Sequence, residues 1–82
     1  MSEQASNPPI KKFRVGDVSA DVWERVTDAG TFHDVSFSRS FKDKQGQWKS
    51  AGNFSAADIG SLRLCLNMAE KFLIEKLMEA QA

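Results

Sequence analysis

The fold of this chain is decided by an alternating stretch at residues 18–26, which reads VSADVWERV. The side chains of an extended strand point alternately to its two faces. One face would therefore carry the small apolar side chains Val18, Ala20 and Val22. The other face would carry charged and aromatic side chains: Asp21, Trp23 and Arg25. This period of two is typical of a strand with one face buried and one face open to solvent.

Three further segments with strand character lie on either side of it, at residues 10–15, 31–42 and 47–54. The inward side chains are expected to be Phe13 and Val15 in the first of them and Val35 and Phe37 in the second. Short runs rich in Gly, Asp and Lys separate the segments, and Gly30 suits the positive φ of a turn. Gly52 weakens the middle of the last strand.

One long helix is predicted from residue 56 to about residue 80, because this stretch contains no proline. Ser55 and Asp58 have the spacing of a capping box at its start. One apolar stripe steps by three and four: Ile59, Leu62, Leu66, Ala69, Leu73 and Leu77. A second stripe adjoins it: Leu64, Met68 and Phe72.

The elements predict an α+β fold of ββββα order, in which a curved four-stranded antiparallel sheet carries the helix on one face. A helix of about 25 residues is nearly 40 Å long at about 1.5 Å per residue, more than a small sheet needs for cover. A chain of 82 residues also buries only a modest core. We therefore expect a homodimer that forms through the helices, with Leu64, Met68 and Phe72 at its interface. The alternative is a surface helix that leaves some apolar side chains exposed.

Composition narrows the functional classes. Residues 1–9 are polar and end in two prolines, so we expect a flexible tail before a single domain at 10–82. Neither a signal-peptide pattern nor an apolar run of membrane-spanning length is present, which favours a cytoplasmic, nucleoid-associated protein and no membrane partner. Cys65 is the only cysteine, so no disulfide framework forms within the chain. Cys65 and His33 are the only soft ligands, and we expect no metal and no cofactor.

The charges balance overall but are distributed unevenly. The chain has 11 Lys and Arg against 11 Asp and Glu. Residues 39–49 are nonetheless rich in basic side chains and contain Phe41 and Trp48. Basic and aromatic side chains on an open sheet suit single-stranded nucleic acid, whose phosphates and unpaired bases they contact. Net neutrality argues against a strongly basic duplex binder.

The residues expected to bind the nucleic acid are Lys12, Arg14, Trp23, Arg25, Arg39, Phe41, Lys42, Lys44, Trp48, Lys49 and Asn53. The alternative is that Trp23 and Trp48 only stiffen the sheet as cross-strand partners. Lys42 and Lys44 would then only keep a turn soluble.

Several stretches share their order and spacing with one known family. They are Phe13-Arg-Val-Gly16, residues 18–25, Gly30…Asp34-Val-Ser-Phe37, Phe41-Lys-Asp-Lys-Gln-Gly46, Lys49 and the long helix. From residue 12 to about residue 75 the chain resembles the positive cofactor four family, whose members are transcriptional coactivator-like single-stranded DNA-binding domains with bacterial and phage relatives. The resemblance implies a ββββα protomer, dimerisation through the helices and a sheet that binds unpaired DNA in transcription, replication or recombination.

The resemblance also bears on single positions. It implies contacts from Trp23 and Arg25, where the basic and aromatic chemistry is exchanged relative to the family, and from Phe41 and Lys49. Asn53 stands where the family has a further basic residue, and Ser38 stands where it has an arginine. Arg39 is the neighbour of Ser38, but it points to the other face unless a bulge intervenes.

Other chemistry has little support in the sequence. His33 and Asp34 are adjacent in a strand and point to opposite faces, so they form no catalytic dyad. Cys65 is expected to be a small buried hydrophobe without a positioned base. We therefore expect no enzyme and no small-molecule substrate. The competing hypothesis is a dimeric protein-interaction module, such as a transcription cofactor or adaptor, which uses the acids near the first hairpin: Asp17, Asp21, Glu24 and Asp28. RNA as the ligand in place of DNA also stays open.

Overall fold

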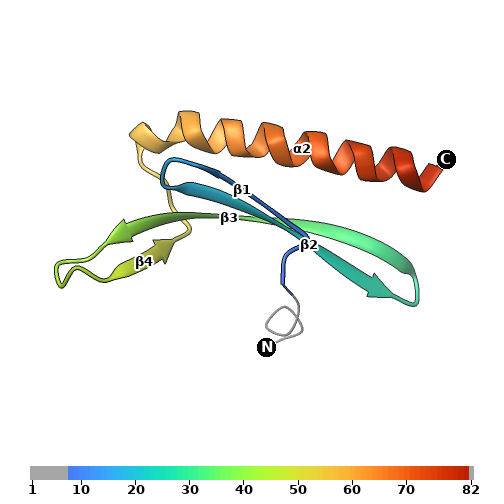
Figure 1. Cartoon of the computed structure of the whole chain (residues 1–82), viewed down its shortest axis with the longest axis horizontal. Helices are drawn as coiled ribbons and strands as arrows, with labels where there is room; N and C mark the ends of the chain where they lie inside the picture. Colours follow the sequence, from blue (N-terminus) through green and yellow to red (C-terminus); the bar gives the residue numbers. More distant parts are fainter. Residues whose placement is uncertain (1–7, 82) are drawn as a thin grey trace.

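The computed structural model describes residues 8–81, with the side chains of residues 80 and 81 left out (Figure 1). Most of the tail predicted at residues 1–9 lies outside this range. The elements follow in the order β1 (Lys11–Val15), β2 (Val18–Thr27), β3 (Gly30–Lys42), β4 (Trp48–Ala51), the 3-10 turn η1 (Ala56–Asp58) and α2 (Ile59–Gln81). The four strands are antiparallel and lie side by side in chain order. The α+β prediction of ββββα order is therefore confirmed.

The alternation in β2 produces the core as predicted. Val18, Ala20 and Val22 are fully buried. Ala20 is paired with Phe13 on β1 and with Phe37 on β3, while Val22 is paired with Val35. These apolar pairs share one face of the sheet because directly opposed residues point the same way. Burying them against α2 is the main favourable contribution to folding.

Helix α2 lies along this apolar face, chiefly over β1 and β2 (Figure 1). Its most buried side chains are the small Cys65 and Ala69, which allow the helix to approach the sheet closely. The Cys65 thiol donates a hydrogen bond of 3.5 Å to the carbonyl of Val18, and burial raises the pKa of this thiol. Further along, the ring of Phe72 meets that of Phe13 edge to face, with 6.2 Å between the centroids.

The line that faces the sheet therefore follows neither predicted stripe as a whole, because it contains Ala69 of the first stripe and Cys65, which belongs to neither. Phe72 and Met68, from the second stripe, are half-buried, whereas Leu66 and Leu77, from the first stripe, are at least half exposed. Leu64 is 52% exposed. The reason is volume, because the shallow sheet accepts Cys65 and Ala69 more closely than it accepts a row of leucines.

The start of the helix is fixed by the predicted capping pair. The Asp58 carboxylate accepts hydrogen bonds from the Ser55 backbone N–H at 3.2 Å and from the Ser55 hydroxyl at 2.8 Å. The same carboxylate lies 3.5 Å from Nε of Arg39 on β3. Arg39 Nε also donates to the carbonyl of Asn53 at 3.1 Å. Arg39 thereby connects the sheet to the beginning of the helix.

The fourth strand is shorter than predicted, since it ends at Ala51 and not at residue 54. The chain turns at Gly52 toward the helix, and the carbonyl of Asn53 bonds to the Arg39 side chain. At the other end of β4, the Asp43 carboxylate accepts 2.9 Å bonds from the backbone N–H groups of Gln45 and Gln47. Gly46 takes a positive φ of 80° in this turn. Within residues 8–81 no helix is both long and apolar enough to span a membrane.

Candidate nucleic-acid interface

The face of the sheet away from α2 is uncovered by other elements of the described chain. Strand register assigns its side chains in rows, since directly opposed residues share a face. We call this surface the open face, and its residues are Lys12, Arg14, Ser19, Asp21, Trp23, Arg25, Phe32, Asp34, Ser36, Ser38, Ser40, Lys42, Trp48 and Ser50.

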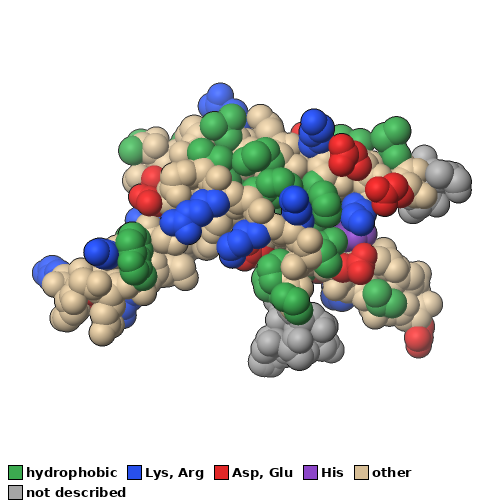
Figure 2. Space-filling view, in the orientation of Figure 1, with side chains coloured by type: hydrophobic (Ala, Val, Ile, Leu, Met, Phe, Trp, Pro, Cys, Tyr) green, Lys and Arg blue, Asp and Glu red, His purple; other side chains and the backbone are tan. Residues whose placement is uncertain are grey.

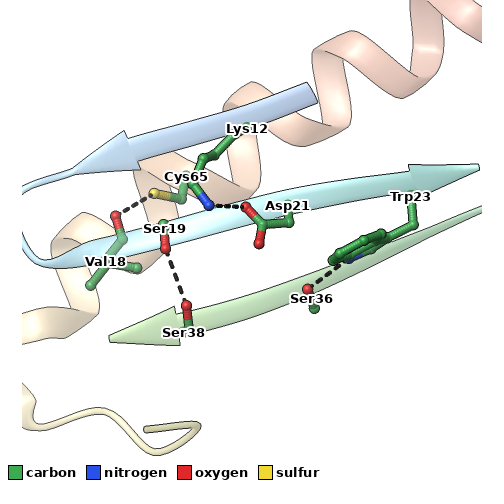
Figure 3. Close-up of polar contacts among 8 residues, drawn as sticks. All are labelled: Lys12, Val18, Ser19, Asp21, Trp23, Ser36, Ser38 and Cys65. Carbon is green, nitrogen blue, oxygen red and sulfur yellow. Dashed lines mark hydrogen bonds and ion pairs between the residues drawn. The ribbon is translucent and has the colours of Figure 1, made fainter. Parts of the chain in front are cut away.

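Serines form the middle of the open face. The hydroxyls of Ser19 and Ser38 lie 3.1 Å apart across β2 and β3 and share a hydrogen bond (Figure 3). Ser40 and Ser50 oppose each other one row further along β3. Ser19 is itself buried, at 7% exposure, so the accessible hydroxyl donors and acceptors of this shallow surface come mainly from the exposed Ser36 and Ser50.

Aromatic side chains lie at both ends of this serine floor. Trp23 donates its indole N–H to the Ser36 hydroxyl at 2.9 Å (Figure 3), and Phe32 lies in the next row, 42% exposed. At the opposite end Trp48 is 64% exposed. Asp34, opposite Trp23, and Lys42, opposite Trp48, are about 27 Å apart along β3 at about 3.4 Å per residue. The open face is thus long enough for several stacked groups in a row.

At the Trp23 end, the cations are paired with carboxylates of the same face. Arg25 donates to Asp34 from Nε at 2.9 Å and from Nη2 at 3.4 Å, and its guanidinium lies 5.2 Å from the centre of the Phe32 ring. The hydrogen bond from Arg25 holds the pKa of Asp34 below its usual value. In the next row, Lys12 Nζ lies 3.0 Å from Asp21 Oδ1 (Figure 3).

At the other end of the open face, the cations lack such partners. Lys42 lies over the Trp48 ring at 5.4 Å, and Lys44 is exposed in the turn that follows. Arg14 donates from Nε to the carbonyl of Gly16 at 3.0 Å. Among the described residues, no ion pair with a carboxylate involves Arg14, Lys42 or Lys44. Figure 2 shows Lys and Arg side chains gathered below the band of hydrophobic side chains that follows α2.

Other residues predicted for binding lie elsewhere. Register assigns Arg39, Phe41 and Lys49 to the face that carries α2, because Phe41 opposes Lys49 and adjacent residues alternate. Arg39 bonds to Asn53 and Asp58 as described, and its guanidinium lies 5.3 Å from the Phe41 ring centre. Lys49 lies 3.7 Å from Asp43, yet 55% of its side chain is exposed because the β3–β4 hairpin extends past the helix (Figure 1).

The sequence prediction did not include Phe32, the serine floor or the paired acids as parts of one surface. Their signal was present, since Phe32, Asp34, Ser36 and Ser38 alternate with the inward residues of β3. Asn53, which the resemblance suggested as a contact, lies in the loop after β4 and contributes its backbone carbonyl to Arg39.

A second exposed surface is apolar and lies on α2. Its largest exposed side chains are Leu64, Leu66, Ile74, Leu77 and Met78. Leu66, Ile74 and Leu77 line a groove between the helix and Val35 of β3. Of the predicted dimer contacts, Leu64 is exposed on the other flank, whereas Met68 and Phe72 pack beside Phe13.

Groups that could support other chemistry are dispersed. His33 Nε2 lies 3.3 Å from a carboxylate oxygen of Glu24 on the face opposite to Asp34. Across the residues that the structure describes, no cluster of His, Cys, Asp and Glu could hold a metal ion.

Known proteins give no indication of the function of this chain, so the function is inferred from its sequence and geometry. No known family model matches the chain, and neither a curated protein nor a solved structure matches it significantly. What the sequence and structure define together is a ββββα fold whose second sheet face ends in aromatic side chains and is not covered by any other element within residues 8–81.

Proposed function

We propose that the protein is a homodimeric single-stranded DNA-binding protein of low sequence specificity. The observation that carries this proposal is the open face, where exposed aromatic rings at both ends flank a shallow serine floor. Unpaired bases expose flat apolar faces, and stacking one base on an aromatic side chain contributes about 1–3 kcal/mol. A duplex hides these base faces within its own stack, so the same surface favours single strands.

The phosphates would be held by the cations without carboxylate partners. Arg14, Lys42 and Lys44 extend from the floor toward the Trp48 end. Cations along the backbone combined with stacking give affinity that depends little on sequence and falls as salt rises. The serine hydroxyls are also suited to the 2′-hydroxyl of RNA, so oligo-U is compared directly with oligo-dT below.

The resemblance to the positive cofactor four family supports the same proposal. The ββββα order that it implied is the observed one. We infer membership of this family and a role in transcription, replication or recombination. Ser38 stands on the open face at the position where the family has an arginine, and the neighbouring Arg39 lies on the face that carries α2. The proposed binding surface therefore depends on the other residues of the open face.

The dimer would form through α2. Its exposed leucines, Leu66 and Leu77, border the groove beside Val35, which a second helix would fill. Met68 and Phe72 are already in contact with their own sheet and would contribute less than predicted. A symmetric pair of helices would bury the apolar flank of both copies at once.

A titration tests the binding proposal. Purified protein is titrated with oligo-dT, oligo-U and a duplex of equal length at several salt concentrations, while tryptophan fluorescence is recorded. We expect quenching by the single strand and a slope of log K against log salt of about −0.7 per phosphate contacted. The hairpin supplies a matched pair of variants, because Lys42→Glu alters the open face and Lys49→Glu alters the opposite face.

Lys42→Glu should weaken binding more than Lys49→Glu. Absence of both quenching and binding at low salt would exclude the proposal. The exposed leucines of α2 favour one second candidate, a dimeric module that docks a partner protein without nucleic acid. Recovery of a defined partner protein in a pull-down that nuclease does not affect, together with no binding of oligo-dT, would favour that candidate.

A further inference from the structure

Two acidic residues lie within the surface that is proposed to bind phosphates. Asp34 accepts two hydrogen bonds from Arg25, and Asp21 lies 3.0 Å from the Lys12 ammonium. Both acids belong to the open face, in neighbouring rows. Each of them faces a cation that the sequence predicted to bind nucleic acid.

Asp34 holds Arg25 in the way that a phosphate would. A guanidinium binds carboxylate and phosphate groups through the same pair of parallel N–H donors. Since Arg25 and Asp34 are diagonal neighbours on β2 and β3, the pair forms without distortion of either strand. Half of the Arg25 side chain and 41% of that of Asp34 remain exposed, so an incoming phosphate can reach the guanidinium.

The contribution of these ion pairs to folding stability is too small to explain why the two acids lie on the open face. The Arg25–Asp34 pair is open to solvent, and such a pair contributes roughly 0–1 kcal/mol to folding. We expect these pairs to affect the affinity for nucleic acid more than they affect stability. Each carboxylate neutralises one cation and places a negative charge where the phosphates of the strand would lie.

We propose that Asp21 and Asp34 are built-in competitors for the phosphates of the bound strand. The inference rests on the proposed function and adds a regulation of the same site. A strand would first engage the end with Lys42, Lys44 and Trp48, and it would reach Lys12 and Arg25 only by displacing a carboxylate. The competitors keep binding reversible and give the open face one strong and one weak end.

Neutralising each acid tests this inference. Asp34→Asn and Asp21→Asn keep the shape of the side chain and remove its charge. Asp34→Glu keeps the charge, and Glu75→Gln makes the same charge change on exposed α2, in the layer on the other side of the sheet. Affinity for labelled oligo-dT is measured by fluorescence anisotropy from low to high salt, and circular dichroism checks the fold of each variant.

Each Asn variant should bind about fivefold more tightly than the unaltered protein at 0.1 M salt, with a slope more negative by about 0.7. This is the effect of one extra phosphate contact on a single strand. Glu75→Gln and Asp34→Glu should change the affinity less than twofold.

Equal or weaker binding by both folded Asn variants would overturn the inference while leaving the proposed function intact. If only one of the two variants is folded, the result for that variant decides in the same way. If neither the unaltered protein nor the Asn variants bind the oligonucleotide, the proposed function and this inference both fail. If only the Asn variants bind, the proposed function fails for the unaltered protein, and so does an inference about how that protein regulates its binding.

Discussion

Trp23 and Ser36 are joined across β2 and β3 by a hydrogen bond of 2.9 Å from the indole N–H to the serine hydroxyl. The bond uses the one polar group of the indole and so fixes the orientation of the ring, while the pairing of β2 with β3 holds the backbone of Trp23 in place. A ring oriented before the ligand arrives loses less conformational freedom on stacking. Trp23 is therefore the aromatic side chain of the open face whose position is most closely defined by its own fold.

Stacking should be strongest at the tryptophans. Replacing Trp48 by alanine is expected to weaken oligo-dT binding by about 5- to 150-fold, the equivalent of the 1–3 kcal/mol of one stacked base. Trp48→Phe retains an aromatic face and should recover most of the affinity. Anisotropy of a labelled oligonucleotide measures both variants without relying on tryptophan emission. Equal affinities for Trp48→Ala and the unaltered protein would contradict a stacking role.

Ser36 should matter through Trp23. Ser36→Ala removes the acceptor of the indole N–H, and we expect it to weaken binding by less than Trp23→Ala does. If Ser36 acts only by orienting the ring, its substitution should have no further effect once Trp23 is alanine. A double-mutant cycle on oligo-dT affinity measures this coupling. Independent, additive effects would show that Ser36 contacts the ligand by itself.

Phe32 provides a test of the register. Phe32→Ala should weaken binding because Phe32 shares the open face with Arg25, its cross-strand neighbour. Val26→Ala is the matched control, since Val26 is 74% exposed on the same hairpin but on the opposite face. The expected order of affinities is unaltered protein, then Val26→Ala close to it, then Phe32→Ala. If Val26→Ala weakened binding more than Phe32→Ala, the result would assign binding to the face that carries α2 and contradict the proposed open face.

The close approach of α2 to the sheet should be sensitive to volume. Ala69→Leu inserts a branched side chain where only 1% of the residue surface is exposed, and it is expected to cost about 1–3 kcal/mol of unfolding free energy. Leu64→Ala, at a position 52% exposed on the flank outside the proposed dimer interface, should cost much less. Urea unfolding measures both changes. A neutral Ala69→Leu would show that the helix can move away from the sheet without loss.

Association should depend on the flank of α2 beside β3. The double variant Leu66→Glu/Leu77→Glu is expected to be monomeric in sedimentation velocity at concentrations where the unaltered protein is a dimer. Leu64→Glu changes the opposite flank and should leave the dimer largely intact. Dissociation by Leu64→Glu alone would return the interface to the stripe first predicted from the sequence.

The Arg25–Asp34 pair predicts a pH dependence with a definite sign. The pKa of Asp34 is lowered by its hydrogen bond from Arg25, so the pair stabilises the fold above the ordinary carboxyl pKa of about 3.9. That contribution is lost as the pH falls through the lowered pKa of the folded protein. Carboxyl carbon NMR should show Asp34 titrating later on acidification than a free aspartate, and Arg25→Gln should return its pKa toward the usual value.

The strands and their inward faces were predictable because they depend on local alternation. Val18, Ala20 and Val22 are predicted and observed to be buried, and Ser55 with Asp58 starts the helical segment as expected. The orientation of α2 was not predictable in the same way. Cys65 and Ala69 face the sheet because their small volumes fit its surface, and a count of apolar side chains favours the neighbouring leucines instead.

The composition of the candidate site was only partly predictable for a similar reason. The sequence identifies the cations and tryptophans, but strand register decides which of them share a face. It separates Lys49 from Trp48, and it brings Asp21 and Asp34 beside Lys12 and Arg25. Such cross-strand pairings join residues far apart in the chain, so inspection of one strand at a time does not show them.

Strand β4 is held by side-chain hydrogen bonds at both of its ends, which affects how readily it could exchange between copies of the protein. This edge strand has only four residues, and among the strands of residues 8–81 it pairs only with β3. The Asp43 turn holds one end, and the bond from Arg39 to Asn53 holds the other. A short edge fixed at both ends is poorly suited to detach and exchange with the same strand of another copy. Arg39, predicted from the sequence to bind nucleic acid, thus helps to hold β4 in its own copy of the chain.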